Sequence, residues 1–422
     1  MLTTSFLPGE ILSDLPYPKT ILGSVGLVGL QLATCVSGLG FTPSDSLIRP
    51  AIFPIIGASL YTLGQTCTEV MPRLLLSNLI GGVACGWLTQ YIVSGLILKE
   101  NIESTPVKGE KKPGFMQRFM FGLNKVNSQR NVGSAYEIVP PFSSKDPAYV
   151  PSRRAFLMWV GAKALGAYIL LDVMTSGEAD VSKTPILFAA DKVFLFSRLG
   201  DVTLEELKLR ASVSIGHWIG SYLVLQLFHS SLAFGTVALG FYEPKSWPPL
   251  FNSFSTVWSL RQYWGKFYHQ LMRPKLTTLS NFFINNLLHL PKSTPHERIF
   301  HRYASLLGVF FFSGLCHVAM DIWGVIPLLE SGALEFFCAQ AGGIMLEDGV
   351  SSFYLRLRGV HKNKDRKPSV WQRVLGAMWV ASWLIWTTPM WIYPGMRRPV
   401  TGPKGELLPF SLVKIATGMF GR

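Results

Sequence analysis

Long stretches with few or no charged residues alternate along the chain with loops that hold most of the charge. A helix needs roughly 20 apolar residues to cross the hydrocarbon core of a membrane. The stretches are continuously apolar instead of alternating, a pattern that favours spanning helices over spanning strands. They cover residues 20–44, 50–68, 74–98, 155–171, 211–242, 303–329, 331–346 and 374–396. The pattern predicts an all-α, polytopic integral membrane protein with about eight transmembrane helices.

One shorter stretch, residues 115–126, mixes aromatic residues with Arg118 and Lys125. Such a mixture is typical of a helix that lies in the lipid headgroup layer. A loop helix packed on the spanning helices fits the pattern equally well. The loops are otherwise too short and too mixed to form separate folded domains, so we predict a single membrane domain over residues 1–422.

The composition excludes an ordinary water-soluble globule. Hydrophobic residues make up 49% of the chain and charged residues 15%, against about 25% charged residues in soluble domains. The net charge of +14 lies in the loops, where it sets orientation in the membrane and does not indicate nucleic acid. By the positive-inside rule, the basic loops 99–154, 242–302 and 347–373 face the cytoplasm. The five cysteines lie in apolar stretches and predict neither a disulfide framework nor a metal site.

The segment 243–274 contains the most informative pattern, WSLRQYWGKFYHQ. From about Ser255 its residues are compatible with a helix. On a helix of 3.6 residues per turn, one face is shared by Trp258, Gln262, Gly265 and His269. Gly265 then leaves an open space one turn before the His269 ring, for a neighbouring helix or for a substrate.

Cations lie on the adjacent face of that expected helix. Lys266, Gln270 and Arg273 follow one another there, where cations can bind the phosphates of a nucleotide-like donor. The alternative is an aromatic and basic belt that anchors the loop at the membrane interface. The composition of the segment leaves both interpretations open.

His317 lies inside the apolar stretch 303–329, and an ionisable residue in a spanning segment is a functional candidate by default. Desolvation keeps an imidazole neutral, which is the form that a general base requires. Asp321 at i+4 can orient the ring. Ser313 at i−4 can pair with it as a nucleophile or hydrogen-bond a carbonyl of its own helix. A histidine that merely packs against a neighbouring helix remains the alternative.

Three further ionisable residues lie in apolar stretches. Lys163 either lines a polar cavity or extends its stem towards the interface. His217 and His229 fit internal packing or internal hydrogen bonds better than a reaction. A transporter with a proton or ion path through Lys163, His317 and Asp321 is the alternative from another functional class, although the chain shows no inverted repeat.

The pattern around His269 and His317 resembles the membrane-bound O-acyltransferases (MBOAT). The upstream sequence EPKSWPPLF resembles their wax-synthase-like branch. Fungal natural-product acetyltransferases belong to this branch. The branch pattern is kept at Ser259, Leu260, Arg261, Trp264, Gly265, Lys266 and His269. Phe267 and Tyr268 depart from it, because a basic residue and a tryptophan are usual there. The elements RNVGS at 130–134 and MLED at 345–348 are also similar to family elements. The wax-synthase-like core covers about residues 240–350.

The resemblance implies an MBOAT-like fold and transfer of an acyl group from acyl-CoA to an alcohol, without metal and without a tightly bound cofactor. By matching position, His317 is the general base that takes the hydroxyl proton, and His269 places or polarises the thioester. The implied donor-binding residues are Arg261, Trp264, Lys266 and Arg273, and the implied supporting residues are Gly265, Ser313 and Asp321.

We therefore expect an acyl-CoA-dependent O-acyltransferase that moves acetyl from acetyl-CoA to a hydroxyl of a terpenoid or meroterpenoid-type metabolite. A long-chain wax-ester or sterol-ester synthase is the alternative within the same reaction class. The expected partners are the lipid bilayer, acyl-CoA and an apolar alcohol acceptor, and not nucleic acid. Because acyl-CoA is cytosolic and no organelle address is visible, the expected location is the endoplasmic reticulum membrane.

Overall fold

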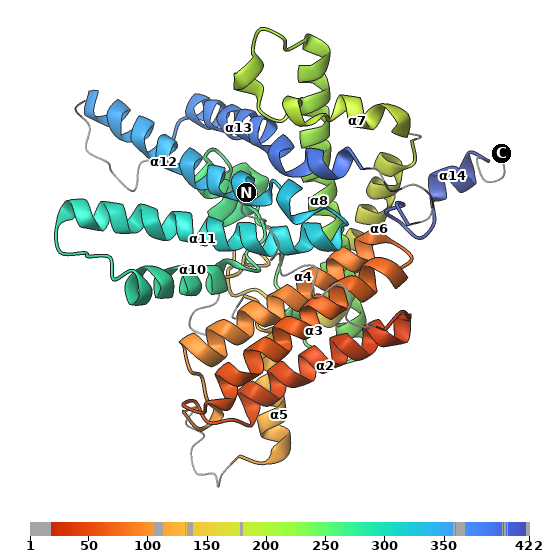
Figure 1. Ribbon diagram of the computed structural model, residues 1–422, viewed down its shortest axis with the longest axis vertical. Helices are drawn as coiled ribbons and strands as arrows, with labels where there is room; N and C mark the ends of the chain where they lie inside the picture. Colours follow the sequence, from red (N-terminus) through yellow and green to blue (C-terminus); the bar gives the residue numbers. More distant parts are fainter. Residues whose placement is uncertain are drawn as a thin grey trace, which may run out of the picture. The chain divides into compact units, whose positions relative to one another are not determined.

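The computed structural model describes residues 18–104, 113–130, 132, 138–177, 180–357, 359, 368–398, 400, 402 and 404–418. Every regular element in this part of the chain is a helix, as predicted (Figure 1). The long helices are α2 (Ile21–Gly40), α3 (Ile48–Val70), α4 (Leu74–Tyr91) with its continuation η1 (Ile92–Ile97), α6 (Arg153–Thr175), α8 (Leu204–Ala238), α11 (Pro295–Trp323), α12 (Ala333–Leu357) and α13 (Val370–Met396). Each predicted apolar stretch is thus occupied by one long helix.

The shorter elements connect these long helices. They include α5 (Phe115–Asn127), α7 (Thr184–Leu187), α9 (Leu260–Gln262), η8 (Tyr263–Phe267), α10 (Arg273–Phe282), η9 (Phe283–Leu287) and α14 (Leu412–Ala416). Within the described residues, four helical stretches are long and apolar enough to cross a membrane: Ile21–Gly40, Leu74–Ile97, Arg153–Thr175 and Pro295–Trp323. The count of about eight crossings therefore stays a prediction.

Several long helices begin at a side-chain cap that the sequence provides. Thr20, Ser152 and Thr203 each accept a hydrogen bond from the backbone N–H three residues later, at the starts of α2, α6 and α8. Ser369 forms a capping box with Gln372 before α13. A cap satisfies one of the backbone donors that the first helical turn leaves unpaired. These caps place the helix starts at or before the edges of the apolar stretches.

The chain forms two compact units. The first comprises Met1–Asn127 with Ile322–Val325, and the second comprises Ser128–Asp321 with Ile326–Arg422. The wax-synthase-like core predicted at about 240–350 lies in the second unit, except for Ile322–Val325 at the end of α11.

The first unit packs α2, α3 and α4 side by side with α5 against α2 (Figure 1). The contact between α5 and α2 requires Gly122, because a Cβ atom there would lie 2.5 Å from the Val36 carbonyl oxygen. The helix predicted at 115–126 is confirmed, and it packs on a long helix as the second interpretation of that stretch expected.

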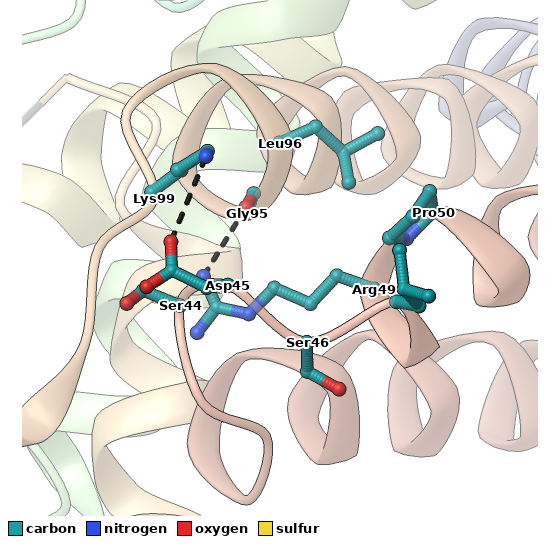
Figure 2. A pocket seen from close by; sticks show the side chains of 9 residues that line it. Ser44, Asp45, Ser46, Arg49, Pro50, Gly95, Leu96 and Lys99 are labelled. Carbon is teal, nitrogen blue, oxygen red and sulfur yellow. Dashed lines mark hydrogen bonds and ion pairs between the residues drawn. The ribbon is translucent and has the colours of Figure 1, made fainter.

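A buried arginine forms hydrogen bonds that join the loop between α2 and α3 to the end of η1. Arg49 is 1% exposed, and its guanidinium donates to the backbone carbonyls of Thr42, Gly95 and Glu100 at 2.8–3.1 Å. Figure 2 shows Arg49 beside a cavity of about 260 Å³, with Lys99 paired to Asp45 at 3.6 Å. Because backbone oxygens already take most of the Arg49 donors, the cavity wall is held together by structural hydrogen bonds.

The second unit has an aromatic core between α8, the α9–η8 turn, α12 and α13. Trp218 of α8 packs against the rings of Tyr263, Trp264, Tyr268 and Phe336 at centroid distances of 5.4–5.9 Å. The core therefore gathers the conspicuous aromatic residues of the WSLRQYWGKFYHQ segment, and all candidate site residues lie in this unit.

Candidate active site

The WSLRQYWGKFYHQ segment forms a much shorter helix than its sequence predicts. The N-cap is Ser259, whose Oγ accepts from the Gln262 N–H at 3.1 Å, so the helix begins at Leu260. It continues as the π-helical turn η8, closed by a 2.8 Å hydrogen bond from the Tyr268 N–H to the Tyr263 carbonyl. Tyr268 is extended and ends the helix.

The single face predicted for Trp258, Gln262, Gly265 and His269 is therefore wrong. A π turn advances by more residues per turn than the α-helix that the prediction assumed, and Trp258 and His269 lie outside the helix at its two ends. The open space at Gly265 is confirmed, because a Cβ atom there would meet nothing within 4 Å.

Two polar side chains close the C-terminal end of η8. Gln270 is buried, and its Nε2 donates to the carbonyls of Trp264 and Tyr268 at 3.0 and 2.5 Å. Arg273 donates from Nη1 to the Gly265 carbonyl at 2.7 Å and to the Gln270 Oε1 at 3.1 Å. These bonds satisfy carbonyls that the end of a helix leaves unpaired. Arg273 thus uses guanidinium N–H groups to stabilise the turn, although the sequence predicted that they bind donor phosphates.

The MLED element closes the other end of the same turn. Glu347 Oε1 accepts from the Leu260 N–H at 2.8 Å, and Oε2 accepts from the Arg261 N–H at 3.3 Å. Oε1 also accepts from Trp379 Nε1 at 3.1 Å. Asp348 forms an ion pair of 2.7 Å with Arg261. A carboxylate at a helix N-terminus satisfies its free N–H groups and its positive end, so this element fixes where α9 starts.

The three predicted phosphate-binding cations therefore differ in their surroundings. Arg261 is paired with Asp348, and Arg273 is bonded to the turn. Lys266 is exposed beside the space at Gly265, and within the described ranges it has no ion pair. Lys266 is the cation of this set that is free to bind a donor phosphate.

The other predicted donor-binding residue, Trp264, is part of the aromatic core. Its Nε1 donates to Gln340 Oε1 at 3.3 Å, and its ring packs edge-on against Phe310 and at a tilt against Phe337. Trp264 is thus part of the aromatic core, whereas Lys266 is exposed.

His317 is held in one tautomer by its own helix. Its Nδ1 lies 2.8 Å from the Ser313 backbone carbonyl oxygen. A carbonyl can only accept, so we assign the hydrogen to Nδ1, and the neutral ring then keeps its lone pair on Nε2. The ring stacks on Phe337 at 4.2 Å and meets Trp391 edge-on at 5.0 Å. Ser313 contributes its carbonyl to this arrangement, which does not support the nucleophile interpretation.

Asp321 does not orient the His317 ring directly, contrary to the expectation. Its Oδ1 accepts from Trp391 Nε1 at 3.1 Å, and its Oδ2 accepts from Ser331 Oγ at 2.6 Å. The i+4 spacing brought Asp321 to the correct helix face, but the carboxylate takes partners from later segments of the chain. Asp321 and His317 both contact Trp391, Asp321 through a hydrogen bond and His317 through its ring.

His269 follows η8 and packs against Tyr268 and Phe251 at centroid distances of 4.6 and 6.3 Å. Its Nδ1 is buried and has no hydrogen-bond partner among the described residues. Burial, with smaller contributions from the positive charges of His317 and Arg130, lowers the pKa of His269 from 6.5 to about 3. The ring is therefore neutral at physiological pH.

His217 of α8, for which the sequence favours internal packing over a reaction, contacts the same indole as His317. Its ring packs edge-on against Trp218 at 5.2 Å and Trp391 at 5.3 Å. Its Nε2 is buried without a hydrogen-bond partner in the described part of the chain. The expected internal packing is present, but the expected internal hydrogen bond at Nε2 is not. The signal that could have found His217 is the one that found His317, an ionisable residue in an apolar stretch.

The remaining sequence candidates lie elsewhere in the second unit. His229 packs edge-on against Trp247 at 5.2 Å, and Lys163 places its Nζ 3.8 Å from the centroid of the Trp159 ring. Of the RNVGS element, Arg130 is buried and donates to the carbonyls of Pro249 and Pro248 at 2.6 and 2.9 Å. Residues 131, 133 and 134 of this element lie outside the described residues.

Comparison with known proteins identifies the family of the chain. The model of the Membrane bound O-acyl transferase family matches residues 247–339, which contain both His269 and His317. No solved structure matches the chain.

Three relatives are similar over most of their length. Acetyltransferase fsoF from Humicola fuscoatra is 34% identical over 89% of this chain and 96% of its own. Acetyltransferase aurG from Calcarisporium arbuscula is 32% identical over 89% and 92%, and acetyltransferase atnC from Arthrinium sp is 31% identical over 89% and 87%. The chain belongs to the membrane-bound O-acyltransferase family, and it is an integral membrane O-acyltransferase.

Proposed function

We propose that the enzyme transfers an acetyl group from acetyl-CoA to a hydroxyl group of an apolar natural product of the terpenoid or meroterpenoid type. The observation that carries the proposal is the Nδ1 hydrogen bond of His317 to Ser313, which leaves the lone pair of Nε2 available to act as a base. The printed names of the relatives, all acetyltransferases, support acetyl as the group transferred.

In the proposed reaction the acceptor oxygen attacks the thioester carbonyl while His317 Nε2 takes the hydroxyl proton. A tetrahedral intermediate forms, the carbon–sulfur bond breaks, and the thiolate takes the proton from His317. The products are the acetyl ester and free CoA, and the base returns to its neutral form. A thioester has a good leaving group, so a positioned base in a site that excludes water is sufficient for this chemistry.

His269 would act on the donor side of the reaction. Its Nδ1 has no partner among the described residues. A neutral imidazole that carries its hydrogen on Nδ1 can donate to the thioester carbonyl oxygen, where negative charge develops. Lys266 and the open space at Gly265 lie on the turn that immediately precedes His269. We therefore place the CoA portion of the donor along η8, with Lys266 at a phosphate.

The walls of the site fit an apolar acceptor. Phe337 and Trp391 pack against His317 at centroid distances of 4.2 and 5.0 Å. Trp218 and Phe336 extend this aromatic wall, with ring contacts of 5.1–6.5 Å. Aromatic walls give a hydrophobic alcohol a large contact area and exclude water, which would otherwise compete for the acetyl group. The transporter path expected as an alternative is not assembled, because Asp321 bonds Trp391 and Ser331 while Lys163 lies over Trp159.

The test is an acetyl-transfer assay with purified protein in detergent. Acetyl-CoA is supplied with farnesol, menthol or cholesterol, and both free CoA thiol and the acetyl ester are measured. We expect alcohol-dependent thiol release with a matching amount of ester. Preference for palmitoyl-CoA over acetyl-CoA would indicate the wax-ester or sterol-ester alternative. Absence of thiol release with every donor and alcohol would contradict the proposal. We further propose that the enzyme lies in the endoplasmic reticulum membrane with its donor site open to the cytosol. Microsomal fractionation tests the location.

A further inference from the structure

His217 has a buried hydrogen-bonding atom that the protein itself does not use. The Nε2 atom is shielded from solvent and has no partner among the described residues. Most buried side-chain polar atoms are hydrogen-bonded, and an exception calls for an explanation such as a ligand that completes the bond.

The two indoles that contact His217 offer no hydrogen-bond partner to its Nε2 atom. Both aromatic neighbours are fixed by hydrogen bonds of their own, Trp218 from Nε1 to Thr388 Oγ1 at 2.8 Å and Trp391 from Nε1 to Asp321 Oδ1 at 3.1 Å. Their indole N–H donors are therefore not available to the imidazole. The ring is held between two anchored indoles with Nε2 unsatisfied.

Trp391 brings His217 and His317 to the same wall. Both imidazoles contact this indole, at 5.3 Å and 78° for His217 and at 5.0 Å and 86° for His317. The unpartnered nitrogen therefore lies in the neighbourhood of the base.

His269 and His217 come from different parts of the fold. His269 follows η8, the turn that carries Lys266, and its ring packs against Phe251 and Tyr268. His217 comes from α8 and shares Trp391 with His317. In the proposed reaction His269 and Lys266 serve the donor, so the wall formed by His217 and Trp391 is left for the acceptor.

We propose that His217 binds the acceptor by donating a hydrogen bond from Nε2 to the oxygen of the hydroxyl that is acetylated. This inference rests on the proposed acetyl transfer. The hydroxyl donates its hydrogen to His317 Nε2 and accepts from His217, which leaves one lone pair for attack on the thioester. As the proton moves to His317, negative charge grows on the oxygen, and the bond from His217 becomes stronger.

The test compares His217→Phe and His217→Gln with the wild type in the acetyl-CoA assay. Loss of a hydrogen bond to a reacting oxygen should lower kcat/KM for farnesol or menthol by roughly tenfold to a hundredfold. The KM for acetyl-CoA should stay within about twofold of wild type, because His217 does not contact the donor in this proposal. His217→Gln, which keeps an N–H donor, should recover part of the loss, and a merely structural role would not give this split.

His229→Phe is the matched control. His229 lies on the same helix and also has a buried, unpartnered Nε2, but its ring packs against Trp247 and not against Trp391. We expect its kcat/KM for the alcohol to equal that of wild type. An unchanged alcohol kcat/KM in His217→Phe, an equal loss in His217→Gln, or a changed acetyl-CoA KM alone would overturn the inference.

A binding measurement separates the inference from the proposed function. Farnesol and menthol are titrated into wild type and His217→Phe without donor, and the tryptophan fluorescence of the site is followed. Weaker binding to His217→Phe by about tenfold supports the acceptor role even if no acetyl transfer is found. Equal affinity for both proteins contradicts it, whatever the transfer assay shows.

Discussion

The imidazole of His317 donates from Nδ1 to the backbone carbonyl oxygen of Ser313, one turn earlier in α11, across 2.8 Å. This bond selects one tautomer without a carboxylate partner. The basic nitrogen is then Nε2, the atom on the opposite side of the ring. The relationship depends on the serine backbone and not on its hydroxyl, which separates two mechanisms that the sequence alone left open.

Replacement of Ser313 by alanine should leave catalysis almost unchanged. The carbonyl that fixes His317 remains, so we expect kcat within about twofold of wild type in the acetyl-transfer assay. A serine nucleophile would instead make Ser313→Ala inactive and would produce an acetylated protein. Mass spectrometry of the wild-type protein after incubation with acetyl-CoA alone distinguishes the two, since we expect no acetyl group on Ser313.

Lys266 should bind the donor through its charge. The Lys266→Ala variant loses one cation that has no partner in the described part of the chain, and we expect KM for acetyl-CoA to rise by roughly tenfold with little change in kcat. Added salt should weaken acetyl-CoA binding in the wild type more than in the variant. Lys292→Ala, in the exposed loop before α11, is the control and should behave as wild type. Equal KM values in both variants would remove Lys266 from the donor site.

Glu347 should be required for the position of the α9–η8 turn. Glu347→Ala leaves the N–H groups of Leu260 and Arg261 and the indole of Trp379 without their acceptor. We expect the free energy of unfolding to fall by about 1–3 kcal/mol and kcat/KM to fall with it, because the turn carries the donor-side residues. Thermal unfolding in detergent and acetyl-transfer kinetics measure the two effects.

Glu297 provides a matched control for this prediction. It accepts from the N–H groups of Ser293 and Thr294 at 2.8 and 2.9 Å at the start of α11, so it caps a helix in the same way. Glu297→Ala should lose about 1 kcal/mol of stability and keep the kinetic constants of wild type. Folded Glu347→Ala protein with wild-type kinetics would show that the cap does not position the site.

The burial of His269 makes stability depend on pH in one direction. Its pKa is about 3 in the folded protein and 6.5 in its ordinary state, so between these values the unfolded chain binds a proton that the folded chain does not. His269 therefore lowers stability as the pH falls from 6.5 towards 3 and has no such effect above 6.5. We expect the melting temperature to drop less between pH 7.5 and pH 5 in His269→Gln than in wild type. An identical drop in both proteins would mean that the folded state protonates His269 easily.

The helical fold could be predicted because apolar length is a local property. The stretch 155–171 became α6 from Arg153 to Thr175, extended at its start by the Ser152 cap. The stretch 211–242 became α8, which begins earlier, at Leu204, because Thr203 caps it. Caps and apolar runs lie within a few residues of the structure they specify.

The site could be predicted as a set of residues but not as a geometry. The π turn η8 displaced His269 from its expected face, and no periodic pattern signals such a turn. Asp321 bonds Trp391, which lies 70 residues later, and this partner follows from tertiary packing alone. His217 joined the site for the same reason, because Trp391 brings it to His317. Side chains that meet across distant helices are set by the whole fold.

The central claim is that His317 Nε2 takes the proton of the acceptor hydroxyl. The most direct test is the single-turnover rate of acetyl transfer in His317→Ala, with acetyl-CoA binding and melting temperature measured on the same preparation. We predict a rate lower by roughly 10²–10⁴-fold, while acetyl-CoA binding and the melting temperature stay near those of wild type. A folded His317→Ala protein that transfers acetyl within about threefold of the wild-type rate would contradict the account.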